Sequence, residues 1–150
     1  MPQSLACLHV HIIFSTKNRE AFLSRNLRTE LDPYMTTVLK NLECHPVAIQ
    51  SVEDHIHILA GLARTISVSD AVKDAKTATS RWIKARDPML NAFAWQAGYA
   101  AFAVSASNVE EVRRYITNQE EHHKSRSFQD EYRAFLQRHG VAFDERYVWD

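Results

Sequence analysis

His55 and His57, two histidines separated by a single isoleucine, lie in an apolar stretch with the composition of a β-strand. Alternate residues of a strand project from the same face, about 7 Å apart, so both imidazoles can turn toward one divalent cation. Ile56 and Ile58 would then enter the core from the opposite face. The pattern predicts a strand with one face for metal chemistry and one for packing.

Tyr115 and Gln119 stand four positions apart in a later stretch that we predict to be helical from Asn108 onward. Residues at this spacing share one face of a helix, which would present a phenol beside an amide oxygen. Asn108 followed by Glu111 resembles an N-terminal capping box. Two imidazoles and an amide oxygen make a mixed site without thiolates, which suits Mg²⁺ or Mn²⁺ better than structural zinc.

A second His-x-His triplet, His9-Val10-His11, precedes this pair in the chain. With eight histidines in 150 residues, such triplets arise by chance. We interpret His9 and His11 as the polar face of a strand, with a second metal site as the alternative. His11 would support the metal-binding histidines from the side if the two strands are neighbours.

The order of these motifs along the chain points to a family. Besides the His-x-His strand and the Tyr-x-x-x-Gln helix, three further segments match that family's recurring motifs in the same order: residues 14–19, 95–99 and 115–123. Together these features resemble the single-tyrosine HUH transposases of the insertion-sequence 200/605 type. The similarity extends over nearly the whole chain, which we expect to be one domain over 1–150.

The resemblance implies a chemistry for each motif. Tyr115 would be the nucleophile and form a 5′-phosphotyrosine intermediate, while His55, His57 and Gln119 would bind Mg²⁺ or Mn²⁺. The implied partners are single-stranded DNA with hairpins and a second copy of the chain, without a nucleotide cofactor. The alternatives are a domesticated HUH nuclease and a module that binds single-stranded DNA without cutting it. A histidine-triad nucleotide hydrolase would need a third histidine at the position of Leu59.

Hydrophobic periodicity and turn residues predict the remaining elements. We expect strands over 5–15, 43–52, 55–61 and 93–106, the last one bulged or split, and helices over 24–41, 67–87, from 108, and 128–136. Pro33 either kinks the first helix or delays its start to Asp32. This order predicts an α+β fold, a ferredoxin-like antiparallel sheet with helices on one face, followed by C-terminal helices.

Basic and aromatic residues supply candidate DNA contacts. We predict contacts from the cationic residues of the loop after the first strand and of the second helix, and from two late histidines: Lys17, Arg19, Lys76, Arg81, His122 and His123. Trp95, Tyr99 and Phe102 would stack on unpaired bases or, as we favour, pack in the core or at a dimer contact.

The overall composition is that of an ordinary globular domain. Eighteen basic and eighteen acidic residues leave no net charge, so a DNA-binding surface requires the basic residues to gather on one side. Cys7 and Cys44 form no metal-binding motif, and we expect both to be buried. No signal peptide or membrane-spanning stretch is evident, which predicts a cytoplasmic protein.

Overall fold

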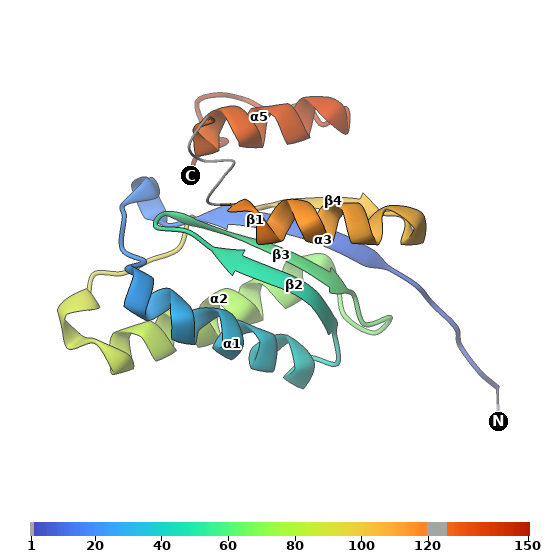
Figure 1. Ribbon diagram of the computed structural model, residues 1–150, viewed down its shortest axis with the longest axis horizontal. Coiled ribbons are helices and arrows are strands. Elements are labelled where there is room, and N and C mark those ends of the chain that lie inside the picture. The colour runs from blue at the N-terminus through green and yellow to red at the C-terminus, as the bar shows by residue number, and fades with distance from the viewer. Residues whose placement is uncertain (1, 120–125) are drawn as a thin grey trace.

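A four-stranded antiparallel sheet forms the centre of the computed structural model, which describes residues 2–119 and 126–150 (Figure 1). The strands and main helices are β1 His9–Ser15, α1 Arg25–Asn41, β2 His45–Ser51, β3 His55–Gly61, α2 Val68–Arg86, β4 Ala100–Val104, α3 Val109–Thr117 and α5 Phe128–Arg138. The strand order is β2-β3-β1-β4, which makes the first and third strands neighbours. The predicted ferredoxin-like fold is confirmed.

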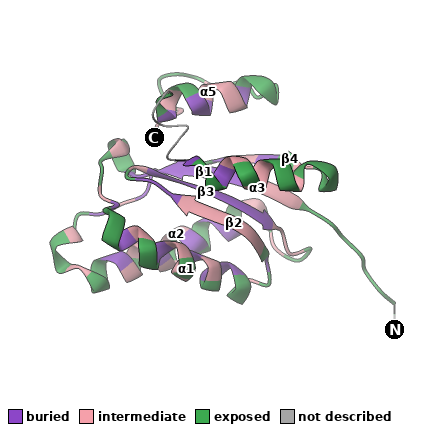
Figure 2. Cartoon of the chain, viewed as in Figure 1, coloured by how far each residue is buried: buried purple, intermediate pink, exposed green. Residues whose placement is uncertain are grey.

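Helices lie over both faces of the sheet. α1 and α2 cover one face, and the C-terminal helices α3 and α5 lie over the other (Figure 1). The residues of β1 and β3 that alternate with histidines pack with α1 and α2 in one core: Ile12, Phe14, Ile56 and Ile58. Figure 2 shows β1 and β3 buried along most of their length. The buried histidines on the other face, His11, His55 and His57, contact aromatic rings of the C-terminal helices.

Helix α1 runs without interruption through Pro33, so a helix that begins near Asp32 is wrong. Ser24 caps its first turn by accepting a hydrogen bond from the amide of Leu27, 3.2 Å away. Pro33 is exposed on the outer side of the helix. The backbone carbonyl that its missing N–H leaves without a helical donor can therefore be solvated by water.

Three predicted strands are shorter in the structure, among them the strand expected over 43–52, which spans His45–Ser51. The first begins at His9, after an exposed segment that contains Leu5 and Cys7. The expected burial of Cys7 is wrong, whereas Cys44 is buried as predicted. Residues 93–106 contain β4 and a single antiparallel bridge between Trp95 and Thr16, which matches the split interpretation.

Helix α3 begins at Val109, as expected, but without the predicted capping box. The Asn108 side chain makes no capping hydrogen bond, because a 3₁₀ turn over Ala106–Asn108 leaves that residue in a helical conformation. An N-cap side chain normally acts from extended backbone. The turn therefore takes over the role of the cap in starting the helix.

The last helix and the tail build a second core on the sheet. Ile13 and Phe102 of the sheet pack with Tyr132 and Leu136 of α5, and Trp149 of the tail joins them. This core holds α5 in place over the histidine face. No helix among the described residues has the length and apolar character needed to cross a membrane.

Candidate metal and nucleophile site

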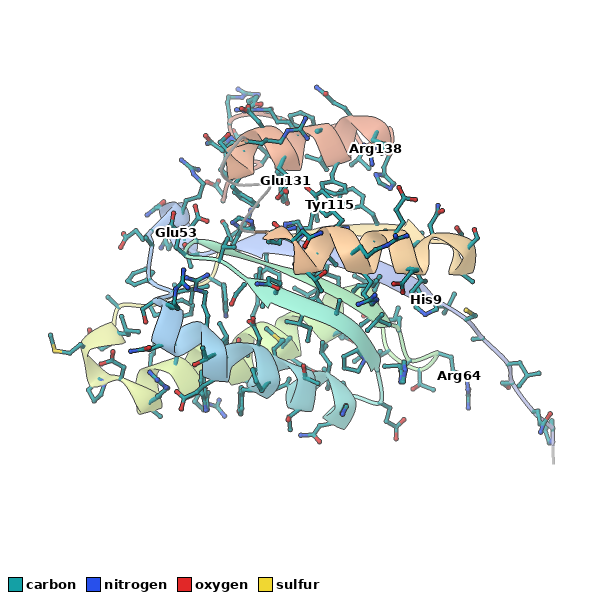
Figure 3. All side chains as sticks on the ribbon, viewed as in Figure 1. His9, Glu53, Arg64, Tyr115, Glu131 and Arg138 are labelled. Atoms are coloured by element: carbon teal, nitrogen blue, oxygen red, sulfur yellow. The ribbon has the colours of Figure 1, made fainter. Side chains whose placement is uncertain are left out.

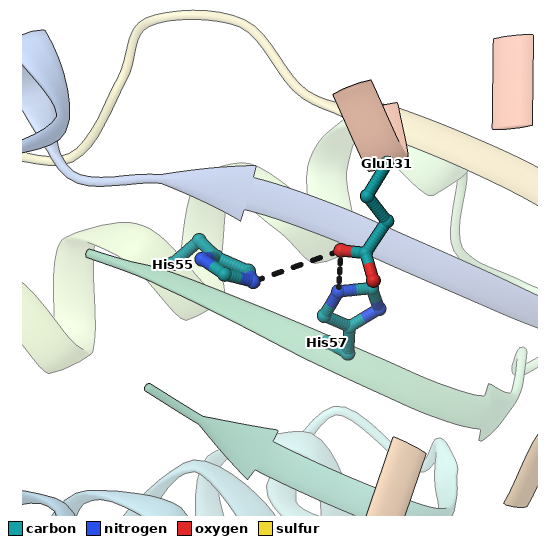
Figure 4. A group of neighbouring side chains, drawn as sticks. All are labelled: His55, His57 and Glu131. Atoms are coloured by element: carbon teal, nitrogen blue, oxygen red, sulfur yellow. Dashed lines mark hydrogen bonds and ion pairs between the residues drawn. The ribbon is translucent and has the colours of Figure 1, made fainter. Parts of the chain in front are cut away.

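His55 and His57 project from β3 toward Glu131 of α5, on the face opposite the main core (Figure 4). Their side chains are buried, at 1% and 0% exposure, and the ring centroids lie 5.3 Å apart. The alternation of the strand produces this arrangement, because Ile56 and Ile58 pack on the other side. The predicted strand with one histidine face and one packing face is present, and its metal binding stays a prediction.

Glu131 of α5 completes a cluster with the two histidines. Its Oε1 lies 2.9 Å from Nε2 of His57 and 3.8 Å from Nε2 of His55 (Figure 4). One ligand atom from each of the three residues lies within 4.8 Å of the others, a spacing that fits one metal ion. Glu131 is buried, and a buried carboxylate needs a compensating charge.

The Nδ1 atoms of both histidines have partners of their own. Nδ1 of His55 lies 2.7 Å from Oδ1 of Asp54, and Nδ1 of His57 lies 2.8 Å from Nε2 of His11. A proton on each Nδ1 leaves the Nε2 lone pair for a cation, which is how proteins commonly orient metal-binding histidines. The donor set therefore fits a divalent cation at the Nε2 atoms and Glu131.

His11 reaches this position because of the strand register. On β1 it pairs with Leu59, so His57 is its diagonal neighbour on the same face. Burial and the neighbouring His57 hold the pKa of His11 well below its usual value. Nε2 of a neutral His11 can accept a hydrogen bond from the Nδ1–H of His57. The predicted supporting position of His11 is present in the structure.

Tyr115 meets the same carboxylate from α3. Its hydroxyl donates a hydrogen bond to Oε2 of Glu131, and its ring centroid lies 6.1 Å from that of His57. Figure 3 shows Tyr115 and Glu131 facing each other between α3 and α5. Burial, then the hydrogen bond to Glu131, raises the pKa of Tyr115 above its usual range. The candidate nucleophile and the candidate metal site thus share one carboxylate within a single chain.

Glu131 was absent from the sequence prediction, although the chain contains a signal for it. It lies on the apolar stripe of its helix, between Phe128 and Phe135. A charged residue on a buried stripe has to meet a partner. Gln119, the predicted third ligand, is fully buried just beyond the end of α3, and its role as a ligand stays a prediction.

The predicted DNA contacts fall into three groups. Lys17 is exposed in a 3₁₀ turn after β1, and the guanidinium of Arg19 lies 5.9 Å from the ring of Trp149. Arg81 is exposed on α2. His122 and His123 lie outside the described residues. The DNA-contact role of all these residues stays a prediction.

Lys76, the remaining predicted DNA contact, has a structural role. Its ammonium donates to the backbone carbonyls of Gln96 and Gly98, at 2.7 and 2.6 Å, and lies 4.9 Å from the ring centroid of Phe14. Burial lowers its pKa to about 8. Lys76 therefore ties α2 to the segment that leads into β4.

A basic groove of about 660 Å³ runs between α2 and this segment. Its cationic lining residues are Lys73, Lys76, Arg81 and Lys84. Trp95 and Tyr99 also line the groove. Trp95 is largely buried, and its indole N–H donates a hydrogen bond to the Thr79 hydroxyl over 3.0 Å. Phe102 is buried in the second core, so both aromatic residues pack in the core, as we favoured. Tyr99 is exposed instead.

Comparisons with known proteins show what the chain is similar to. A family model described as transposase IS200 like matches residues 4–119. A proposed transposase from Deinococcus radiodurans R1 aligns with a TM-score of 0.65 and 24% identity over 79% of this chain and 98% of its own. A REP-associated tyrosine transposase bound to a REP hairpin aligns with a TM-score of 0.62 and 14% identity, over 82% of this chain and 72% of its own. No curated protein gives a match.

Proposed function

The chain belongs to the IS200-like transposase family, and from this premise we propose that it cleaves and rejoins single-stranded DNA through a covalent bond between Tyr115 and a 5′ phosphate. The observation that carries the proposal is the Glu131 carboxylate, which contacts both the Tyr115 hydroxyl and Nε2 of His57. A phosphate bound beside the Tyr115 hydroxyl would therefore also lie beside the candidate metal site.

The residues of the site divide the reaction among them. The oxygen of Tyr115 attacks phosphorus, the bond from phosphorus to the 3′ oxygen breaks, and the departing 3′ oxygen takes up a proton. Oε2 of Glu131 already accepts the hydrogen bond of the phenol and is the nearest acceptor for its proton. The phosphotyrosine bond preserves the energy of the phosphodiester, so a second 3′ hydroxyl can reverse the step and join new ends.

The metal is part of the proposal. His55, His57 and Glu131 would hold Mg²⁺ or Mn²⁺, with Gln119 as the further ligand expected from the sequence. A cation bound there supplies charge that neutralises a non-bridging phosphate oxygen. Burial of the site strengthens this interaction, because water is largely excluded.

The proposed substrate is single-stranded DNA that carries a hairpin near the cleavage site. The structural relative bound to a REP hairpin supports this choice, as does the basic groove along α2. Lysine and arginine side chains there would contact phosphates without reading the base sequence. The exposed ring of Tyr99 in the groove would stack on unpaired bases.

A denaturing gel tests the covalent step. The protein is mixed with labelled single-stranded oligonucleotides from its own flanking DNA, with Mg²⁺ or Mn²⁺. We expect a protein-linked label that disappears in Tyr115→Phe and His57→Ala and persists in Tyr147→Phe, an exposed tyrosine outside the site. Retarded but uncut DNA in a native gel, with no linked label under either metal, would support the non-cutting binding module instead.

A homodimer also belongs to the proposal. Tyr115 and His57 meet within one chain, so each protomer would hold a complete site and act in cis. Sedimentation equilibrium measures the oligomeric state. Mixing Tyr115→Phe with His57→Ala protein should then restore no linked label, because neither chain has both residues. Recovery of label in the mixture would instead require a tyrosine that acts on the partner's histidines.

A further inference from the structure

A cavity of about 470 Å³ opens beside Tyr115, between β4, α3 and α5. Tyr115 and His11 line it, whereas His55, His57 and Glu131 belong to the neighbouring metal site. Its volume falls in the range of about 300–1,000 Å³ typical of small-ligand sites. A group bound in this cavity would therefore touch the nucleophile without occupying the metal site.

Aromatic rings form one wall of the cavity. Phe102 stacks on His139, with centroids 4.4 Å apart and planes 26° apart, and on Phe135, at 5.6 Å and 22°. Phe102 is buried, Phe135 is half-buried and His139 is exposed. Unpaired nucleic-acid bases stack on such ring clusters in a manner that tolerates every base.

Two arginines add positive charge to the same cavity. Arg126 precedes α5 and Arg138 is its last residue, and both line the space beside Tyr115. Figure 3 shows Arg138 at one end of α5 and Glu131 nearer the other, with Tyr115 below the helix. The charges of both arginines act on the Tyr115 hydroxyl. Glu111 is the acidic residue of the lining.

We propose that this cavity binds one unpaired nucleotide next to the scissile phosphate, with its base on the Phe102–Phe135–His139 wall and its phosphate between Arg126 and Arg138. The inference rests on the proposed function, since it deepens the substrate of that site. A base inserted here is enclosed between β4 and two helices, which leaves no room for its pairing partner. The cavity therefore selects a single-stranded nucleotide at the position of cleavage.

Binding of abasic oligonucleotides tests the proposal. Tyr115→Phe protein, which cannot be linked to DNA, is titrated by fluorescence anisotropy with single-stranded oligonucleotides in which one base at a time is removed. Stacking contributes about 1–3 kcal/mol per base, so removal of the one base in the cavity should weaken binding by roughly 5- to 150-fold. The sensitive position should adjoin the site at which the wild-type protein cleaves.

Variants of the wall and the arginines locate the sensitive base. In the same background, Phe135→Leu should abolish the abasic penalty, and Arg138→Gln should weaken binding of the intact oligonucleotide. Arg146→Gln, an exposed arginine in the tail outside the cavity, serves as the control and should change neither. Circular dichroism verifies that each variant is folded.

The outcomes separate this inference from the proposed function. An equal penalty at every abasic position, or a penalty unchanged in Phe135→Leu, would overturn the nucleotide cavity even if wild-type protein forms the Tyr115 adduct. A single sensitive position that depends on Phe135, together with no adduct under any metal, would support the cavity and reject the cleavage reaction.

Discussion

Glu131 joins two chemistries that the sequence had placed on separate elements. One carboxylate oxygen contacts His57, and the other accepts a hydrogen bond from the Tyr115 hydroxyl. The Glu131 side chain is only 1% exposed. A buried carboxylate that faces two imidazoles is most stable when a cation lies among them. The position of Glu131 in the first turn of α5, where the helix dipole favours negative charge, adds to this stability.

Glu131→Gln should weaken Mn²⁺ binding by at least about 10-fold. Removing a residue that only hydrogen-bonds to a metal ligand already lowers metal affinity by about 10- to 100-fold, and Glu131 would be a ligand itself. The substitution keeps the size of the side chain and removes its charge. Isothermal titration calorimetry on the metal-free protein measures the change, and Glu145→Gln, an exposed tail residue, is the control. Gln119→Ala in the same assay tests the ligand predicted from the sequence. Unchanged Mn²⁺ affinity in Glu131→Gln would remove that residue from the site.

His11 should make the metal-free protein less stable as the pH falls below about 6.5. Burial keeps the pKa of folded His11 well below that value, so the unfolded chain takes up a proton that the folded chain does not. The free energy of unfolding then decreases by up to about 1.4 kcal/mol per pH unit, until the folded pKa is reached. Urea unfolding between pH 7 and about pH 5 should show a shallower decrease for His11→Gln, which still offers His57 a hydrogen-bond acceptor. Equal slopes in the two proteins would contradict this account.

The elements that bear the site were predictable to different degrees. The alternation of histidine and isoleucine in β3 gave its two faces, because a strand places alternate residues on opposite sides. The strand order put His11 near His57. Both inferences need only local periodicity and a known topology.

The docking of α5 was not predictable in the same way. The contact between Glu131 and His57 spans 74 positions and depends on how the second core seats the helix. Hydrophobic periodicity predicted the helix over 128–136, but it did not indicate which strands the helix packs against. Tertiary packing, rather than local pattern, decides which ligand meets the histidines.

Lys76→Met should destabilise the protein by about 1–2 kcal/mol, because the carbonyls of Gln96 and Gly98 lose a charged donor that water replaces only in part. Urea unfolding measures the loss. Lys73→Met, one turn earlier on α2 and exposed, should change stability by less than about 0.5 kcal/mol. If Lys76→Met instead kept full stability and lost DNA affinity, Lys76 would act only as a DNA contact.

The whole molecule has no net charge, so long-range attraction of DNA has to come from segregated basic residues. The basic residues that line the groove along α2 would supply this attraction. Gln96 lines the groove and accepts a hydrogen bond from the amide of Ser15 over 3.0 Å, while Ser15 pairs with His55 on β3. The groove and the candidate metal site thus approach each other at the end of β1, and under the proposed function a strand of DNA would pass between them there.

The salt dependence of DNA binding tests this path. Each phosphate contact made by a single strand adds about −0.7 to the slope of log K against log salt concentration. Replacing both Arg81 and Lys84 of the groove by alanine should therefore reduce the magnitude of the slope by about 1.4. Fluorescence anisotropy of a hairpin oligonucleotide over a series of salt concentrations gives the slope, and Lys40→Ala, an exposed lysine near the end of α1, should leave it unchanged. If the double variant and Lys40→Ala gave the same slope as the wild type, the DNA would have to reach Tyr115 without crossing α2.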